Sequence, residues 1–257
     1  MDIAWLGTIF MIGLIGSFLS GMLGIGGAII KFPMLLYIPP LLGFTAFTSH
    51  QVTGISSVEV VFASLAGVLA YKNGKYLNKQ LILIMGSAVI IGSLIGSFGS
   101  SYLSEQAINI VYGILAIMAA IMMFLPTKEL PETDEMIFNK PLAFVVAIIA
   151  GVASGIVGAG GGFILVPIML VVLKIPMRMT IASSLAITFI SSIGGSLGKI
   201  TTGQVEWVPT IVMIIASLIA APIGAKVSKK MSKKRLKILL AGLIVLTAVK
   251  IWTDVLF

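Results

Sequence analysis

The chain contains no cysteine and a single histidine in 257 residues. It therefore has no disulfide, no thiol nucleophile and no thiolate metal ligand, and one imidazole is too few for a transition-metal site built from side chains. These absences predict a protein that works without a metal or any other cofactor.

Charged residues are also scarce. Only 10% of the residues are charged and 58% are hydrophobic, whereas about a quarter of a soluble chain is charged. The uncharged runs 3–30, 32–58 and 80–104 each exceed the roughly 20 residues that a helix needs to cross a bilayer. Because no run alternates strictly between apolar and polar residues, helices and not a barrel are expected. The predicted class is an all-α polytopic membrane protein.

Two stretches share an unusual glycine pattern. "SGMLGIGGAIIKFP" spans residues 20–33 and "SGIVGAGGGFILVP" spans 154–167, so that each matching position recurs 134 residues later. Internal repetition is a sign of a secondary transporter. Further matches are Ser49 with Ser183, Ser57 with Ser191 and, at a spacing of 128, Gly96 with Gly224 and Ser104 with Ser232.

The repeat predicts two halves of five helices. The polar stretch 127–140 would be a linker between a first transmembrane repeat, 1–126, and a second one, 141–257. The second segment of each half is short or broken by proline, and whether it crosses or re-enters is left open. We expect about ten transmembrane segments (8–10), near 3–25, 28–47, 49–71, 80–101, 107–125, 141–159, 162–174, 179–199, 208–228 and 236–256.

The distribution of basic residues predicts the orientation. Seven of the 17 basic residues lie in 226–237, between apolar segments, which is typical of a cytoplasmic loop facing anionic lipid and not of nucleic-acid binding. Loop 72–79 holds three lysines, whereas its counterpart 199–206 holds one lysine and one glutamate. Because equivalent loops carry opposite bias, we expect inverted repeats in an inner membrane, with loops 72–79 and 226–237, Lys174 and Arg178 inside and both termini outside.

The glycine clusters are expected to break their helices inside the membrane. Glycine followed by proline unwinds one helix and starts another. The free N–H groups and the positive dipole end of each new helix would then form a site for an anion near the bilayer midplane.

Small polar residues follow each cluster at helical spacing. His50, Thr53 and Ser57 share one face of a helix, and Ser184, Thr188 and Ser191 do so in the second half. We expect these faces to line the path of a small hydrated oxyanion, although hydroxyls that bond their own helix backbone are a common alternative. The candidate substrate-binding residues are Ser20, Gly24, Gly26, Gly27, Ser49, His50, Thr53, Ser57, Ser154, Gly158, Gly160, Gly161, Ser183, Ser184, Thr188 and Ser191.

Ionisable groups inside the membrane are costly and usually functional. Glu59 is a candidate for carrying a coupled proton, with His50 and Lys31 as further candidates. Lys31 could instead attract the anion or pair with an acid. Catalysis is not expected: His50 and Ser56, six residues apart on one helix, are related by a rotation of about 240° and so point about 120° apart, too far for a base and its nucleophile.

The two glycine motifs, each followed by a serine-containing stretch ("FTSHQVTG" and "IASSLAIT"), resemble those of the TauE/SafE family of sulfite-exporter-type permeases, over nearly the whole chain. The resemblance implies a carrier of small sulfur-containing anions such as sulfite, sulfoacetate or other organosulfonates. It also implies that Gly24, Gly26, Gly27, Gly158, Gly160, Gly161 and the two prolines, Pro33 and Pro167, form the family motifs. We expect this transport to be coupled to protons. The alternatives to a carrier of sulfur-containing anions are a ten-helix inverted-repeat exporter of small organic metabolites and a passive anion channel.

Overall fold

The computed structural model describes residues 2–26, 28–71, 76–125 and 138–256, where the regular secondary structure is entirely helical. The first half contains α1 (Ile3–Leu23), α2 (Ala28–Leu41), α3 (Ser49–Tyr71), α4 (Lys79–Gly99), the 3₁₀-helix η1 (Ser100–Tyr102) and α5 (Glu105–Phe124). The second half contains α6 (Lys140–Val157), α7 (Gly162–Pro167), the π-helix η2 (Ile168–Val172), α8 (Met177–Thr201), α9 (Trp207–Lys230) and α10 (Lys233–Leu256).

Eight helices within the described ranges are long and apolar enough to span a bilayer. Two shorter apolar helices, Ile29–Leu41 and Gly162–Val172, occupy the predicted short segments. The all-helical polytopic class is therefore confirmed. Ten complete crossings remain a prediction, since α2 and the α7–η2 pair are shorter than a usual span.

Polar residues fix where several helices begin. Asp2, Asn78, Ser104 and Asn139 each precede a helix and accept a hydrogen bond from a backbone N–H of its first turn. Such N-caps satisfy donors that have no partner inside the helix. They set the ends of the apolar segments without placing a charge inside the bundle.

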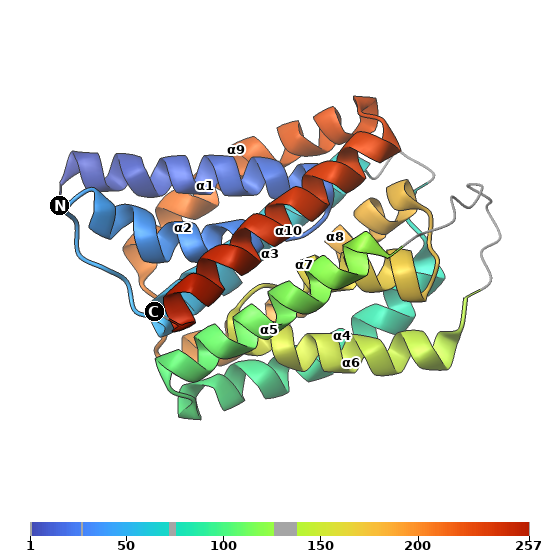
Figure 1. The fold of residues 1–257 in the computed structure, drawn as a ribbon, viewed down its shortest axis with the longest axis horizontal. Helices are drawn as coiled ribbons and strands as arrows, with labels where there is room; N and C mark the ends of the chain where they lie inside the picture. Colours follow the sequence, from blue (N-terminus) through green and yellow to red (C-terminus); the bar gives the residue numbers. More distant parts are fainter. Residues whose placement is uncertain (1, 27, 72–75, 126–137, 257) are drawn as a thin grey trace.

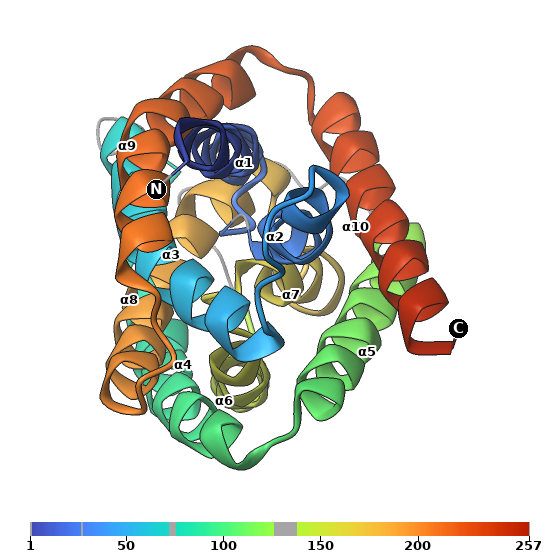
Figure 2. The ribbon, with the colours of Figure 1, turned by 90° about the vertical axis from the view of Figure 1, so that its left-hand side faces the viewer.

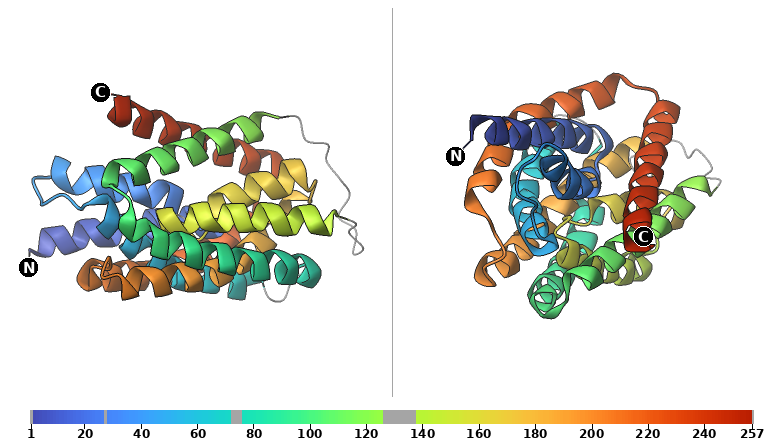
Figure 3. Two further views of the ribbon diagram at one scale, coloured as in Figure 1. Left: turned by 90° about the horizontal axis from the view of Figure 1, so that it is seen from below. Right: turned by 60° about the vertical axis from the view of Figure 1, so that its left-hand side comes forward.

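Corresponding helices of the two halves run in opposite directions. In Figure 1, α1 runs from left to right and α6 from right to left, and α5 and α10 are opposed in the same way. The described ends of the chain lie at one end of the bundle, and the ends that border the linker lie at the other (Figures 1 and 3).

The packing between the halves is reciprocal. The first helix of each half lies along the fourth helix of the other, α1 on α9 and α6 on α4. A Cβ at Gly224 would collide with the carbonyl oxygen of Phe18, and a Cβ at Gly96 with that of Val152. Phe18 and Val152 are separated by the repeat spacing of 134, so the matched glycines make matched close approaches.

The basic end of the bundle brings together three distant segments. Arg178 at the start of α8 donates to the carbonyl oxygens of Lys229 (3.0 Å) and Met231 (3.5 Å). Its guanidinium also lies 5.8 Å from the ring centre of Tyr76, and the Lys229 ammonium 5.0 Å from that of Tyr71. The ends of α3 and α9 and the start of α8 therefore share one side of the bundle, as the distribution of basic residues predicts.

The short helices lie in the interior. Viewed along the bundle in Figure 2, α2 and α7 are enclosed by longer helices, with α3 and α8 on one side and α5 and α10 on the other. Because α3 and α8 are the most buried of the long helices, the centre of the molecule lies where they meet the two short ones.

Candidate functional site

Both glycine motifs end a helix in the same way. α1 stops at Gly24 and α6 at Gly158, each in the left-handed conformation, with φ of 75° and 70°. Gly26, Gly160 and Gly161 also have positive φ, a conformation that costs side-chain-bearing residues roughly 1–2 kcal/mol. The predicted breaks are therefore present in both halves.

The two breaks touch each other. A Cβ at Gly162, the first residue of α7, would lie 2.5 Å from the carbonyl carbon of Ile25. Gly26 and Gly160 both face Thr188 of α8, since a Cβ on either would lie within 2.9 Å of the Thr188 methyl group. The same added Cβ atoms would also lie close to Val60 of α3. Only glycine backbone fits between α3 and α8 here.

An aromatic side chain of α5 holds the short helices together. The ring of Tyr112 stacks on Phe32 of α2, with centroids 4.4 Å apart, and lies 6.0 Å from Phe163 of α7. Its hydroxyl donates to the carbonyl oxygen of Ile29.

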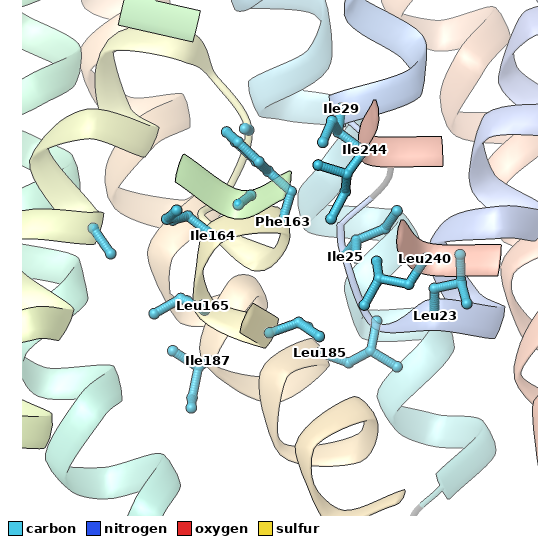
Figure 4. Close-up of a cluster of buried hydrophobic side chains, with 14 of the residues drawn as sticks. Leu23, Ile25, Ile29, Phe163, Ile164, Leu165, Leu185, Ile187, Leu240 and Ile244 are labelled. Carbon is cyan, nitrogen blue, oxygen red and sulfur yellow. The ribbon is translucent and has the colours of Figure 1, made fainter. Parts of the chain in front are cut away.

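Apolar side chains surround the breaks. Figure 4 shows Leu23, Ile25 and Ile29 directed toward Leu240 and Ile244 of α10, and Leu165 near Ile187 of α8. Apolar side chains of α8 and α10 therefore pack against both breaks.

Several buried hydroxyls beside these breaks have no hydrogen-bond partner. Thr188 lies against both loops, Ser191 follows it one turn later, and Ser57 faces Gly195, where a Cβ would lie 2.9 Å from its Oγ. An unsatisfied buried donor costs about 1–3 kcal/mol, so such a group in a native protein requires an explanation. Among the described residues the buried polar atoms without a partner are the hydroxyls of Ser20, Ser56, Ser57, Thr188 and Ser191 and the Trp252 Nε1.

Other candidate hydroxyls are engaged within the protein. Ser154 donates to Gly151 O (3.0 Å), and Ser184 donates to Gly24 O (2.8 Å) and to Ile181 O (3.1 Å). Ser183 lies beside Tyr76 and Asn78, and Ser49 donates to Asn109. Ser184 therefore makes a structural contact to the first break. Ser49 lies at the start of α3 and Ser183 near the start of α8, at opposite ends of the bundle.

Lys31 and Glu59 form a fully buried ion pair between α2 and α3. Ser17 of α1 completes it, because its hydroxyl donates to Glu59 Oε1 at 2.8 Å and lies 3.4 Å from the Lys31 ammonium. Of the roles considered for Lys31, pairing with an acid is therefore the one that the structure shows. A role for either group in proton coupling stays a prediction.

A second buried lysine was missed as a site residue by sequence reasoning. Lys199, counted there with the loop 199–206, lies in the last turn of α8 with no exposed side-chain surface. A lysine at the end of an apolar helix is usually an interface residue, so no local sequence pattern indicates that Lys199 is buried. Its ammonium donates to Thr53 Oγ1 (2.9 Å), Ser100 Oγ (2.7 Å), Gln204 Oε1 (2.8 Å) and the carbonyl oxygen of Ile156 (3.1 Å).

His50 belongs to this second cluster. Its Nδ1 lies 3.1 Å from Gln204 Oε1 and its Nε2 lies 3.1 Å from Leu103 O. The half-buried imidazole therefore connects to Lys199 through Gln204, and its role as a proton carrier remains a prediction. Gly27, also a candidate site residue, lies outside the described residues, as do Lys72, Lys75 and most of the linker.

The fold and this site define a class. Eight apolar spans with two broken helices meeting at buried polar groups are the construction of a multi-pass membrane transporter. Comparison of the sequence with known families is more specific: the family described as "Sulfite exporter TauE/SafE" matches residues 9–251. The chain belongs to this family.

Relatives of similar length carry the same general description. The chain is 25% identical over 224 residues to "Probable membrane transporter protein YunE" of Bacillus subtilis, covering 79% of this chain and 81% of that protein. It is 30% identical over 214 residues to a "Probable membrane transporter protein" of Xylella fastidiosa, covering 79% and 77%. A protein of Methanocaldococcus jannaschii with that description is 24% identical over 203 residues, covering 79% and 73%. No solved structure matches the chain.

Proposed function

We propose that this membrane transporter is a proton-coupled secondary carrier of small sulfur-containing anions, such as sulfite, sulfoacetate or other organosulfonates. It would consist of two inverted five-helix repeats and bind its anion where the two broken helices meet. The observation that carries the proposal is the contact between the two glycine breaks beside the unpartnered hydroxyls of Ser57, Thr188 and Ser191.

The donors at this place suit an oxyanion. Hydroxyl groups can donate to sulfur-bound oxygens. The first turn of α7, which follows its N-cap Gly161 and begins with Gly162 against the first break, presents backbone N–H groups and a positive dipole end. The name of the family, a sulfite exporter family, supports a sulfur oxyanion as cargo. The close packing of Gly26 and Gly160 against Thr188 of α8 and Val60 of α3 favours a small anion over a bulky organic metabolite.

The opposed directions of corresponding helices support the inverted-repeat architecture. In such a carrier the two halves rock around one shared site, which is then open to each side in turn. With the basic ends of α3 and α9 in the cytoplasm, the positive-inside rule places the described start of α1 and end of α10 outside the inner membrane.

Proton coupling rests on the buried pair of Lys31 and Glu59. Glu59 directly precedes Val60 on α3, a helix that lines the proposed site, so a change in the charge of its carboxylate acts on that helix. Protonation of Glu59 would release the Lys31 ammonium and Ser17 from their shared carboxylate. This links proton binding to the arrangement of α1, α2 and α3.

Flux in proteoliposomes tests the function. Sulfite, thiosulfate, sulfoacetate, taurine and sulfate would be offered with and without an imposed proton gradient, and protein-free liposomes serve as the blank. Saturable uptake of one sulfur anion that increases with the gradient supports the proposal. Saturable uptake that ignores the gradient removes the coupling, and non-saturable anion leak favours a passive channel. No uptake of any of these anions by folded protein argues for an exporter of organic metabolites.

A further inference from the structure

Lys199 differs from the other fully buried lysine of the described core in lacking a carboxylate. Lys31 is neutralised by Glu59, whereas all four oxygens around the Lys199 ammonium belong to neutral groups: two hydroxyls, one amide and one backbone carbonyl. A buried charge without a counter-ion is costly. A protonated Lys199 therefore has a positive charge that none of the described groups in contact with it balances.

The surroundings stabilise this charge only in part. The carbonyl oxygen of Ile156 belongs to the last turn of α6, and Lys199 itself lies in the last turn of α8. The carbonyl ends of two helices carry partial negative charge. That partial charge orients an ammonium but is smaller than the full charge of a carboxylate.

The ammonium lies at one end of the row of unpartnered hydroxyls. On α8, Thr188, Ser191, Gly195 and Lys199 follow one another at spacings of three and four residues and share a helix face. On α3, Thr53, Ser57 and Val60 have the same kind of spacing. The two faces meet at both ends and in the middle: Lys199 contacts Thr53, Gly195 faces Ser57, and Thr188 and Val60 enclose the breaks.

We infer that Lys199 provides the positive charge that binds the transported anion and selects it by charge. This rests on the proposed function and names an additional binding residue at the same site. The ammonium has three protons and four neutral acceptors, so an oxyanion oxygen can replace a neutral oxygen such as Gln204 Oε1 and add the attraction between two full opposite charges to the hydrogen bond. Ser57, one turn from Thr53, is then free to donate to another oxygen of the same anion.

Substitutions at Thr53 test the charge without removing the lysine. In Thr53→Asp a carboxylate faces the ammonium and reproduces the arrangement of Lys31 with Glu59, whereas Thr53→Asn introduces a neutral side chain of almost the same shape. Because the two variants differ in charge and hardly in size, the comparison separates neutralisation of Lys199 from disturbance of its neighbours. Lys199→Gln and Lys199→Arg remove and keep the charge directly. Lys230→Gln, at an exposed lysine near the end of α9, makes the same change of charge far from the site.

Binding of sodium sulfite, sulfate and sulfoacetate to each purified variant in detergent would be measured by calorimetry, and flux of the same anions in proteoliposomes. We expect Thr53→Asp to bind at least about tenfold more weakly than Thr53→Asn, and Lys199→Gln at least about tenfold more weakly than Lys199→Arg. Lys230→Gln should bind as the unchanged protein does. If Lys199→Gln does not fold, the comparison of Thr53→Asp with Thr53→Asn decides alone, since both variants keep the Lys199 ammonium and its other hydrogen-bond acceptors.

The outcomes separate this inference from the proposed transport. Equal affinity of Thr53→Asp and Thr53→Asn overturns the role of Lys199 even when the unchanged protein carries sulfite. Binding that depends on the charge of Lys199 without flux of any of the anions supports the site and overturns the transport. Absence of both binding and flux in the unchanged, folded protein overturns both.

Discussion

Gly26 and Gly160, separated by the repeat spacing of 134 residues, face the same two side chains, Thr188 and Val60. Two segments from opposite halves thus share one contact at the centre of the bundle. If α3 and α8 move apart or together during transport, both breaks respond at once. In the proposed carrier, the contact that couples the two halves would therefore lie beside the polar site.

Replacement of Gly160 by alanine should abolish most of the flux. The added Cβ would lie 2.8 Å from both Thr188 Cγ2 and Val60 Cγ1, and φ is +61°. The strain of the left-handed conformation alone costs about 1–2 kcal/mol, and the collision pushes α3 and α8 apart. We expect sulfite flux to fall more than about tenfold while the protein remains monodisperse in detergent.

The matched control is Gly43→Ala. Gly43 also has a positive φ, +83°, but nothing lies within 4 Å of an added Cβ. This variant should lose only the roughly 1–2 kcal/mol of the left-handed conformation and show normal flux. Equal flux in the two variants would show that the central contact is not needed for transport.

Removal of the unpartnered hydroxyls should separate activity from stability. In Ser57→Ala and Ser191→Ala no hydrogen bond within the described structure is lost, and an unsatisfied buried group disappears. The free energy of unfolding should stay equal or rise by about 1 kcal/mol. If these hydroxyls bind the anion, the concentration for half-maximal flux should increase severalfold.

Ser217→Ala is the corresponding control on α9. Its hydroxyl is fully buried and bonds to the carbonyl oxygen of Ile214 at 2.8 Å, in its own helix. Flux should not change in this variant. A loss of stability in Ser57→Ala or Ser191→Ala, with unchanged flux, would indicate that these hydroxyls serve packing.

The architecture around the site was largely readable from the sequence, because it depends on local features. Long uncharged runs fix the spans, and the glycines at 24, 26, 158, 160 and 161 take the positive φ that only glycine adopts cheaply. The match of Gly96 with Gly224 became a pair of equivalent helix contacts. Each of these features is a property of a short stretch of chain.

The polar contacts could not be predicted, because they depend on which distant residues meet. Ser184 and Ser191 lie on the same helix and were given the same role, yet the first bonds to Gly24 and the second has no partner. The burial of Lys199 follows from the position of α6 and η1 around the end of α8. Nothing near it in the sequence distinguishes it from a lysine at the membrane surface.

Removal of one charge of the Lys31–Glu59 ion pair should destabilise the fold more than removal of both charges. Glu59→Gln leaves the Lys31 ammonium buried without a carboxylate, which typically costs about 3–5 kcal/mol. The double variant Lys31→Met with Glu59→Met removes both charges and should recover most of this loss. The apparent melting temperature in detergent measures the difference, and a double variant no more stable than Glu59→Gln would contradict it.

The same variants test proton coupling. If Glu59 carries the proton, the double variant should be folded and should transport the anion with a flat dependence on pH, while the unchanged protein responds to the gradient. Flux measured across a series of external pH values provides the comparison. An unchanged pH profile in the folded double variant would remove Glu59 from the coupling and leave His50 as the candidate.

The orientation can be determined by labelling, because the chain has no cysteine and every introduced thiol is unique. Gly43→Cys places a thiol in the exposed turn after α2, and Lys230→Cys places one near the exposed end of α9. The end of α2 and the end of α9 lie at opposite ends of the bundle in Figure 1. A membrane-impermeant maleimide should label the first in right-side-out vesicles and the second only in inside-out vesicles.

Gly203→Cys adds an internal check of the inverted arrangement. Nothing lies within 4 Å of a Cβ added to Gly203, which lies between α8 and α9. Gly203 belongs to the loop that the sequence repeat pairs with the basic loop 72–79. In inverted repeats the two loops must face opposite sides, so Gly203→Cys should label together with Gly43→Cys and never with Lys230→Cys. Labelling of Gly203→Cys from the side opposite to Gly43→Cys would place it on the side of loop 72–79 and contradict the inverted arrangement, and the proposed shared site between opposed helix breaks would then lose its basis.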